Sequence, residues 1–275
     1  MNRKELAAAK RIVVKIGTSS ITLSSGKLDI VRIDKLARVL SGIKAQDREV
    51  VLVTSGAISA GADRLGLGER PSTVSGRQAA ASVGQSSLME FYNKSFAQCG
   101  CVAGQVLLTK DVLDKPISRQ NAENTFAELF KWGVIPVINE NDTISTDEIC
   151  FGDNDNLSAC VAVLVNADLL VLLTDTDGVF DSDPNGNKNA KLINRVDCPE
   201  TLRVDLSGRS SRHGTGGMQS KVNAAAFAAK HGINAVVANA GNERVLSEIL
   251  VGKEVGTWFV KHRTVDYEQQ AQKTD

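Results

Sequence analysis

Short apolar runs alternate along the chain with longer segments whose apolar residues have helical spacing. The runs predict buried strands, because each is short and rich in Val, Ile or Leu. Strands that alternate with helices predict an α/β protein with a largely parallel sheet, covered by helices on both faces. The predicted strands lie at 11–16, 49–55, 105–108, 134–138, 168–174, 233–238 and 256–260, and the predicted helices at 30–45, from 56 onward, and at 74–98, 120–132, 157–165, 222–231 and 244–250.

Two of the predicted helices contain residues that bear on where they begin or break. Gly84 lies within the helix at 74–98, where we expect an interruption because glycine is a poor helix former. Asn154 or Asp155 is suited to cap the helix at 157–165, since either side chain can accept a hydrogen bond from a first-turn N–H.

The predicted strand at 134–138 runs directly into an acidic segment without Lys or Arg. Like charges held close repel, so such a segment faces either water or a cationic partner. Four Asn residues interleave with the acids and can donate as well as accept, which favours ligand binding, while a solvated acidic loop stays open as the alternative. The acids are Glu140, Asp142, Asp147, Glu148, Asp153 and Asp155, and the amides are Asn139, Asn141, Asn154 and Asn156.

Two other predicted strands lead directly into small residues. Lys15 lies in the apolar run 11–16, and Gly17 follows that run at once, a place where backbone N–H groups can converge on an anion, although a lysine here can also extend to an edge. Ser55 precedes Gly56 and a helix N-terminus, which favours anions. The sequence around Ser55 does not fit the nucleophile elbow of hydrolases, so we interpret it as a binding residue.

The second half of the chain contains two further polar segments. The most apolar strand, 168–174, ends in Thr174 and Asp175. A Gly-rich basic loop at 207–217 then leads through residues 218–221 into the helix predicted at 222–231, with Lys221 at the N-terminus of that helix. Phosphate binding and a simple hinge explain this loop equally well on the residues alone.

Composition excludes several classes of function. The net charge is formally zero and the basic residues are scattered, so no nucleic-acid partner is expected. We find neither an apolar signal region at the start nor an apolar run of about 18 residues, so we expect a cytoplasmic protein that does not enter a membrane. The five Cys have no metal-site spacing and are expected to be reduced, and three His support little His-based chemistry.

Taken together, the motifs resemble the glutamate 5-kinase family of the amino acid kinase superfamily, over about residues 10–260. The motifs are 15–19 (KIGTS), 53–58 (VTSGAI), 138–142 (INEND), 152–158 (GDNDNLS), 173–175 (LTD) and 214–218 (GTGGM). The resemblance implies an open αβα sandwich that phosphorylates the γ-carboxylate of L-glutamate with ATP and Mg²⁺, the first step of proline synthesis. It implies one domain at 1–260, with the amino-acid site in its N-terminal part and the nucleotide site in its C-terminal part, and a polar tail at 261–275.

The resemblance also assigns roles to individual residues. Lys15 and Lys221 act on the transferring phosphoryl group, and Asp155 holds the two lysines in position. The substrate contacts Ser55, Asn139, Asp142 and Asn154, with the α-ammonium against Asp142, and no protein residue is assigned to a metal. The nucleotide contacts Lys15, Gly17, Thr174, Asp175, Thr215, Gly216, Gly217, Met218, Gln219, Ser220 and Lys221.

Alternatives and further expectations accompany this assignment. Many family members carry a C-terminal PUA domain, which we expect to be absent here. The segment 175–180 fits uridylate kinases and aspartokinases equally well. N-acetylglutamate kinase is an alternative within the superfamily, and a non-catalytic glutamate or proline sensor is an alternative outside enzymes. Family resemblance further suggests feedback inhibition by proline and a homodimer or homotetramer.

Overall fold

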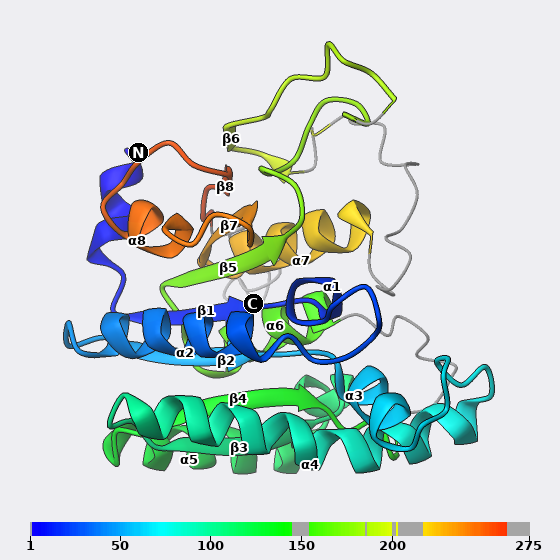
Figure 1. Cartoon of the computed structure of the whole chain (residues 1–275). Helices are drawn as coiled ribbons and strands as arrows, with labels where there is room; N and C mark the ends of the chain where they lie inside the picture. Colours follow the sequence, from blue (N-terminus) through cyan, green and yellow to red (C-terminus); the bar gives the residue numbers. More distant parts are fainter. Residues whose placement is uncertain (1, 145–153, 185, 200–201, 203–216, 263–275) are drawn as a thin grey trace, which may run out of the picture.

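The structure, a computed structural model, describes residues 2–144, 154–184, 186–199, 202 and 217–262. Its centre is an eight-stranded sheet in the order β3-β4-β2-β1-β5-β7-β8-β6 (Figure 1). All neighbouring strands are parallel except β7 and β8. The strands are β1 Arg11–Lys15, β2 Glu49–Val53, β3 Ala103–Leu108, β4 Ile135–Glu140, β5 Leu169–Thr174, β6 Arg195–Val196, β7 Asn234–Asn239 and β8 Thr257–Phe259.

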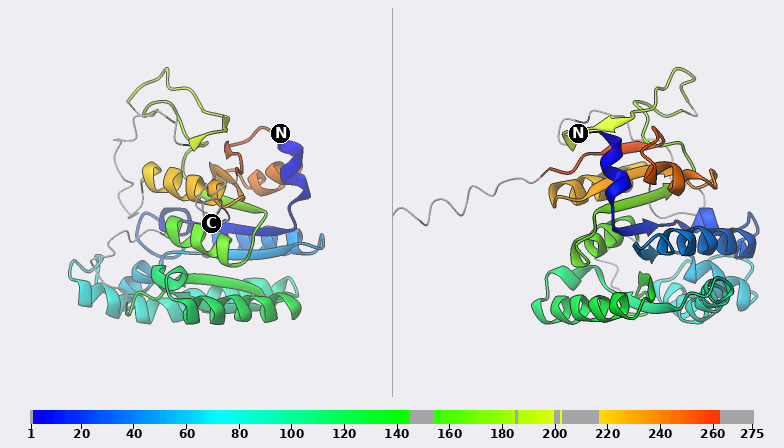
Figure 2. Two further views of the ribbon diagram at one scale, coloured as in Figure 1. Left: turned by 180° about the vertical axis from the view of Figure 1, so that it is seen from behind. Right: turned by 90° about the vertical axis from the view of Figure 1, so that its left-hand side faces the viewer.

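Helices cover both faces of this sheet, as the alternating pattern predicts (Figures 1 and 2). The α-helices are α1 Thr18–Ile21, α2 Ile30–Lys44, α3 Ala57–Arg64, α4 Val74–Gln98, α5 Pro116–Lys131, α6 Asn154–Leu164, α7 Met218–Lys230 and α8 Val245–Leu250. Two 3₁₀ helices, η1 Arg3–Ala8 and η2 Lys110–Leu113, complete the described elements. None of the described helices combines the length and the apolar character needed to cross a membrane.

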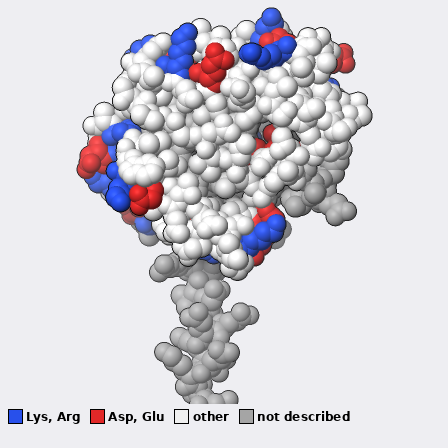
Figure 3. Space-filling view, turned by 90° about the horizontal axis from the view of Figure 1, so that it is seen from below, with Lys and Arg blue, Asp and Glu red and all other residues white. Residues whose placement is uncertain are grey.

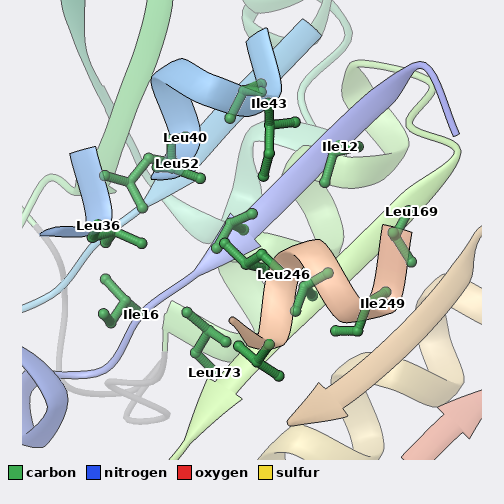
Figure 4. Close-up of a cluster of buried hydrophobic side chains, with 14 of the residues drawn as sticks. Ile12, Ile16, Leu36, Leu40, Ile43, Leu52, Leu169, Leu173, Leu246 and Ile249 are labelled. Carbon is green, nitrogen blue, oxygen red and sulfur yellow. The ribbon is translucent and has the colours of Figure 1, made fainter. Parts of the chain in front are cut away.

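The strands divide their side chains between two hydrophobic cores. Successive side chains of a strand point to opposite faces, so Ile12 and Val14 of β1 lie in one core and Val13 lies in the other. The first core packs against α2, α4 and α8, and Figure 4 shows part of it, with Leu36 and Leu246 reaching the sheet from two of these helices. The second core packs against α5, α6 and α7. Burial on both faces explains why the central strands are continuous apolar runs.

Two details of the predicted helices are wrong. The helix α4 is continuous through Gly84, because this glycine serves packing between helices: a Cβ there would lie 1.8 Å from the carbonyl oxygen of Ala57 in α3. The helix α6 begins at Asn154, so Asn154 and Asp155 lie in its first turn instead of capping it. Smaller differences are an earlier start of β3 and α5, and the short elements η1 and β6, which the pattern did not predict.

Several predicted segments cannot be compared with the structure. Residues 145–153 of the acidic segment, including Asp147, Glu148 and Asp153, lie outside the described residues. The same holds for most of the Gly-rich loop, with Thr215 and Gly216, and for most of the polar tail.

Candidate active site

The polar residues named from the sequence gather at one edge of the sheet. Lys15 ends β1, Thr174 ends β5, and Asn139 lies near the end of β4, while Ser55 follows β2. These four strands are parallel, so their carboxyl ends meet at the same edge. The strands β2, β3 and β4, which follow β1 in the chain, all lie on one side of β1, and the next strand, β5, lies on its other side. The α/β folds bind ligands where the strand order changes direction in this way.

At this edge, one carboxylate contacts two lysines. Lys15 Nζ lies 2.5 Å from Asp155 Oδ1, and Lys221 Nζ lies 3.1 Å from Asp155 Oδ2. Ser220 also donates its hydroxyl to Asp155 Oδ2 at 2.8 Å. Asp155 is fully buried, and the two lysines are 4% and 8% exposed, so the contacts are shielded from water.

The charges of this cluster do not cancel. Two ammonium groups and one carboxylate leave one net positive charge in a buried position, where electrostatic interactions are stronger than in water. Removing either lysine would leave a neutral pair, whereas removing the carboxylate would leave two like charges close together. The arrangement therefore favours a bound anion, and Asp155 keeps both cations at one place.

Backbone N–H groups add to this preference for anions. The helix α7 begins at Met218 after Gly217, and no described side chain caps it. The helix α3 begins at Ala57 after Gly56, again without a side-chain cap, and Gly56 has φ of 99°, a left-handed conformation that glycine adopts without strain. Open N–H groups at helix N-termini bind phosphates and carboxylates. Gly17 also lies beside the cluster, since a Cβ there would be 3.6 Å from Lys15 Nζ.

A set of amide side chains lies at the same edge of the sheet. Asn154 Nδ2 lies within hydrogen-bond distance of Thr54 O at 2.5 Å, Asn139 Oδ1 at 2.8 Å and Ser55 Oγ at 2.9 Å. Asn139 Nδ2 in turn donates to Gln85 Oε1 of α4 at 2.8 Å. Asn154 therefore contacts both of the other predicted substrate residues in this set, Ser55 and Asn139.

The fourth predicted substrate residue, Asp142, lies near a cationic side chain of the protein itself, Arg70. Asp142 is half-buried after β4. Desolvation and the nearby charge of Arg77 lower the pKa of Arg70, and the carboxylate of Asp142 acts in the opposite direction. The acidic segment thus has a cationic neighbour from the region between α3 and α4, which the sequence pattern did not indicate.

The predicted nucleotide residues differ in what their side chains contact. Thr174 is buried and donates its hydroxyl to Asp175 Oδ1 at 3.1 Å. Met218 packs against the second hydrophobic core, and Gln219 donates to Asn223 at 2.8 Å along the surface of α7. Of the α7 residues, Ser220 and Lys221 are thus the ones that contact Asp155.

Sequence reasoning missed polar residues that support the site from behind. Gln85 and Tyr92 lie on α4, seven positions apart and hence on the same face of the helix. Gln85 holds Asn139, and the Tyr92 hydroxyl lies 2.8 Å from Thr54 Oγ1, next to Ser55. Neither residue belongs to a strand end or a glycine-rich turn, so no local signal marks them.

The described residues contain no group of three His, Cys, Asp or Glu side chains able to hold a metal ion. Asp155, the carboxylate nearest the lysines, is occupied by three donors. The ammonium groups of Lys15 and Lys221 and the uncapped helix N-termini form a donor set that suits a phosphate-bearing ligand.

Comparison with known proteins identifies the family of this chain. The sequence pattern of the amino acid kinase family matches residues 10–239. The chain belongs to the amino acid kinase family. Its relatives include the glutamate 5-kinases of Clostridium perfringens, 48% identical over 94% of this chain and 98% of that protein, and of Ligilactobacillus salivarius, 47% identical over 95% and 100%. The chain belongs with these glutamate 5-kinases, and the resemblance stated from the motifs is confirmed.

Solved structures confirm the fold class. The isopentenyl phosphate kinase of T. acidophilum aligns over 90% of this chain and 99% of its own with a TM-score of 0.63 and 18% identity. The UMP kinase of Bacillus anthracis aligns over 92% and 96% with a TM-score of 0.61 and 18% identity. These similarities concern the fold alone, since the identities are low.

Proposed function

We propose that this chain transfers the γ-phosphoryl group of ATP to the γ-carboxylate of L-glutamate, forming L-glutamyl 5-phosphate, the first step of proline synthesis. The observation that carries the proposal is the buried contact of Lys15 and Lys221 with Asp155, beside the amide cluster at the same sheet edge. The relatives named above support the substrate, since each is a glutamate 5-kinase.

The chemistry fits a site that is rich in cations and poor in bases. The attacking carboxylate of glutamate is already ionised at neutral pH, so no general base is required. Charge spreads over the oxygens of the transferring phosphoryl group, and catalysis rests on positioning and electrostatic stabilisation. Lys15 and Lys221 supply that stabilisation in the proposal, and Asp155 keeps both of them oriented.

The amide cluster is proposed to hold the amino-acid substrate. Asn154 and Ser55 lie beside the N-terminus of α3, whose open N–H groups suit a carboxylate. Asn139 orients Asn154, because Asn139 Oδ1 accepts a hydrogen bond from Asn154 Nδ2. Asp142 is proposed to attract the α-ammonium group, in competition with Arg70 nearby.

We propose that the nucleotide binds at the part of this sheet edge that is formed by the C-terminal half of the chain. Gly17, Thr174 and Asp175 are proposed to contact it together with the segment 215–221, and Thr215 and Gly216 of that segment lie outside the described residues. Mg²⁺, when bound to ATP, neutralises phosphate charge and orients the phosphoryl group. This division implies one catalytic unit over 1–260, with the amino-acid site in its N-terminal part.

One assay tests the proposed reaction. ADP release from Mg-ATP is measured with L-glutamate, N-acetyl-L-glutamate, L-aspartate and UMP in parallel, with hydroxylamine present to trap an acyl phosphate as a hydroxamate. We expect turnover and hydroxamate with glutamate alone. Turnover only with N-acetylglutamate or UMP would assign the lysines to another kinase reaction, and no turnover by folded protein that still binds glutamate would favour a sensor.

We also propose that proline inhibits by competing at the glutamate site, since it presents a carboxylate next to a cationic nitrogen as glutamate does. An increase in the glutamate KM with added proline, at constant maximal rate, is the expected result. The cytoplasm is the proposed location, where ATP and glutamate are available.

Self-association as a homodimer or homotetramer is proposed on the basis of one face. Figure 3 shows a broad face with charged side chains mostly near its margin, on the side where α4, α5 and the edge strand β3 lie. Exposed apolar side chains near the ends of β3 and α5 include Val102 and Trp132. Light scattering during gel filtration is expected to give a mass of two or four chains, and the mass of one chain would reject this proposal.

A further inference from the structure

The orientation of the Asn139 amide is fixed by a backbone group. The N–H of Glu140 can only donate, and it donates to Asn139 Oδ1 at 2.9 Å. The oxygen of Asn139 therefore faces Glu140, and its NH₂ group faces Gln85. Gln85 must then present its oxygen, and Asn139 Nδ2 lies 2.8 Å from Gln85 Oε1.

The orientation of Asn154 follows in the same way. Thr54 O can only accept, so Asn154 must direct its NH₂ group toward it. Ser55 Oγ and Asn139 Oδ1 lie within reach of the same nitrogen. No group among the described residues donates to Asn154 Oδ1, so this oxygen remains for a ligand. An amide oxygen is an acceptor and suits an ammonium group.

Gln85 is an unfavourable choice for packing alone. Its side chain is 8% exposed, and its Nε2 meets no acceptor within the part of the chain that the structure describes. A buried donor without an acceptor is destabilising. A Met side chain would fill a similar volume without that donor, so the feature gained by glutamine is the acceptor Oε1.

We propose that Gln85 is a positioning residue for substrate recognition: it fixes the Asn139 amide, which fixes Asn154 and the acceptor presented to the α-ammonium of the substrate. Hydrogen bonds thus connect α4 through β4 and α6 to the end of β2. The proposal rests on the function proposed above and adds a specificity-determining residue to it. This series of hydrogen bonds does not include Lys15, Lys221 or Asp155. The affinity for ATP should therefore be unaffected by a change at Gln85.

The test compares Gln85→Met with Gln85→Glu. Gln85→Met removes the acceptor for Asn139, and we expect the glutamate KM and Kd to rise about tenfold while the ATP KM stays within about twofold, as for loss of one buried hydrogen bond. Gln85→Glu keeps an acceptor oxygen at the same place, so we expect it to retain most of the glutamate affinity.

Ser87→Ala is the matched control. Ser87 is also buried on α4, and its hydroxyl accepts from Arg64 at 3.2 Å without contacting the amides. Ser87→Ala should therefore leave both KM values unchanged, whatever its effect on thermal stability.

Calorimetric binding of glutamate keeps the two proposals distinguishable. Wild-type protein that binds glutamate but forms no hydroxamate would reject the kinase function, while the Kd values would still test Gln85. The positioning role would be overturned if Gln85→Met changed the KM for ATP and the KM for glutamate equally, or changed neither. It would also be overturned if Gln85→Glu impaired glutamate binding as much as Gln85→Met does. Absence of glutamate binding by the folded wild type would overturn both.

Discussion

At the scale of single residues, the site depends on the net positive charge of the cluster formed by Lys15, Lys221 and Asp155. We expect Lys15→Ala or Lys221→Ala to lower kcat roughly 10²-fold or more, because each removes one preorganised cation and leaves Asp155 neutralising the other. Steady-state ADP release with saturating glutamate and ATP measures the effect. Lys230→Ala, at the exposed end of the same helix α7, is the control and should retain full activity. Near-normal turnover of either site variant would remove that lysine from the mechanism.

Tyr92 adds a residue-scale prediction about pH. Burial raises the pKa of Tyr92 above its ordinary value of 10.0, although the hydrogen bond with Thr54 acts in the opposite direction. The stabilisation linked to this shift is complete below pH 10. Above pH 10 the unfolded state releases the proton while the folded state keeps it, so the free energy of unfolding falls by up to about 1.4 kcal/mol per pH unit.

The substitution Tyr92→Phe isolates this linkage. At pH 8 we expect the variant to be less stable than wild type by about 1 kcal/mol, from loss of the contact with Thr54. Between pH 8 and 10.5 the difference should narrow by roughly 1 kcal/mol, because phenylalanine does not titrate. Urea unfolding of both proteins at the two pH values measures the change, and a constant difference would contradict the linkage.

At the scale of elements, the crossing of α3 and α4 places the start of α3 beside Ser55. A Cβ at Gly84 would lie 1.8 Å from Ala57 O and 2.3 Å from Gly61 N, so Gly84→Ala must push the two helices apart. We expect a loss of about 1–3 kcal/mol in stability and a raised glutamate KM, since Ala57 begins α3. Thermal unfolding and kinetics measure both effects.

A second glycine provides the control for this substitution. Gly42 lies in α2 with nothing within 4 Å of its missing Cβ, so Gly42→Ala should stabilise the protein by up to about 1 kcal/mol through helix propensity alone. If Gly84→Ala behaved like Gly42→Ala, the helices would not be in the close contact described here.

The same crossing illustrates what the sequence can and cannot predict. The spacing of apolar residues and the polar residues at strand ends are both visible in short stretches of sequence. The parallel sheet could therefore be predicted, together with Lys15, Ser55 and Asn139 at its edge. Gly84 appeared to interrupt a helix because its role depends on a partner helix elsewhere in the chain. Gln85 next to it has no local signal, since a polar residue in a helix is usually on the surface and only tertiary packing buries this one.

At the scale of the whole molecule, Arg3 joins the first element to the last ones. Its guanidinium donates to the carbonyl oxygens of Lys253, Val255, Asn194 and Gly256, all at least 191 positions away. Burial lowers the pKa of Arg3 below its ordinary value, with a smaller opposite effect from Glu254. The helix η1 lies beside α8 at this junction (Figure 1). The charged N-terminal segment is therefore joined to the C-terminal part of the fold by buried hydrogen bonds of Arg3.

Replacing Arg3 should consequently change stability far more than activity. Arg3→Met leaves several buried carbonyl groups without donors, and we expect a loss of about 2–4 kcal/mol, or about 2–4 °C in Tm for each kcal/mol. The kinetic constants at 25 °C should stay near wild type, because Arg3 contacts none of the site residues. Lys4→Met, an exposed neighbour in the same 3₁₀ helix, should leave Tm unchanged. Differential scanning calorimetry of the two variants tests the junction, and equal melting temperatures would show that it contributes little to holding the N-terminal and C-terminal parts of the chain together.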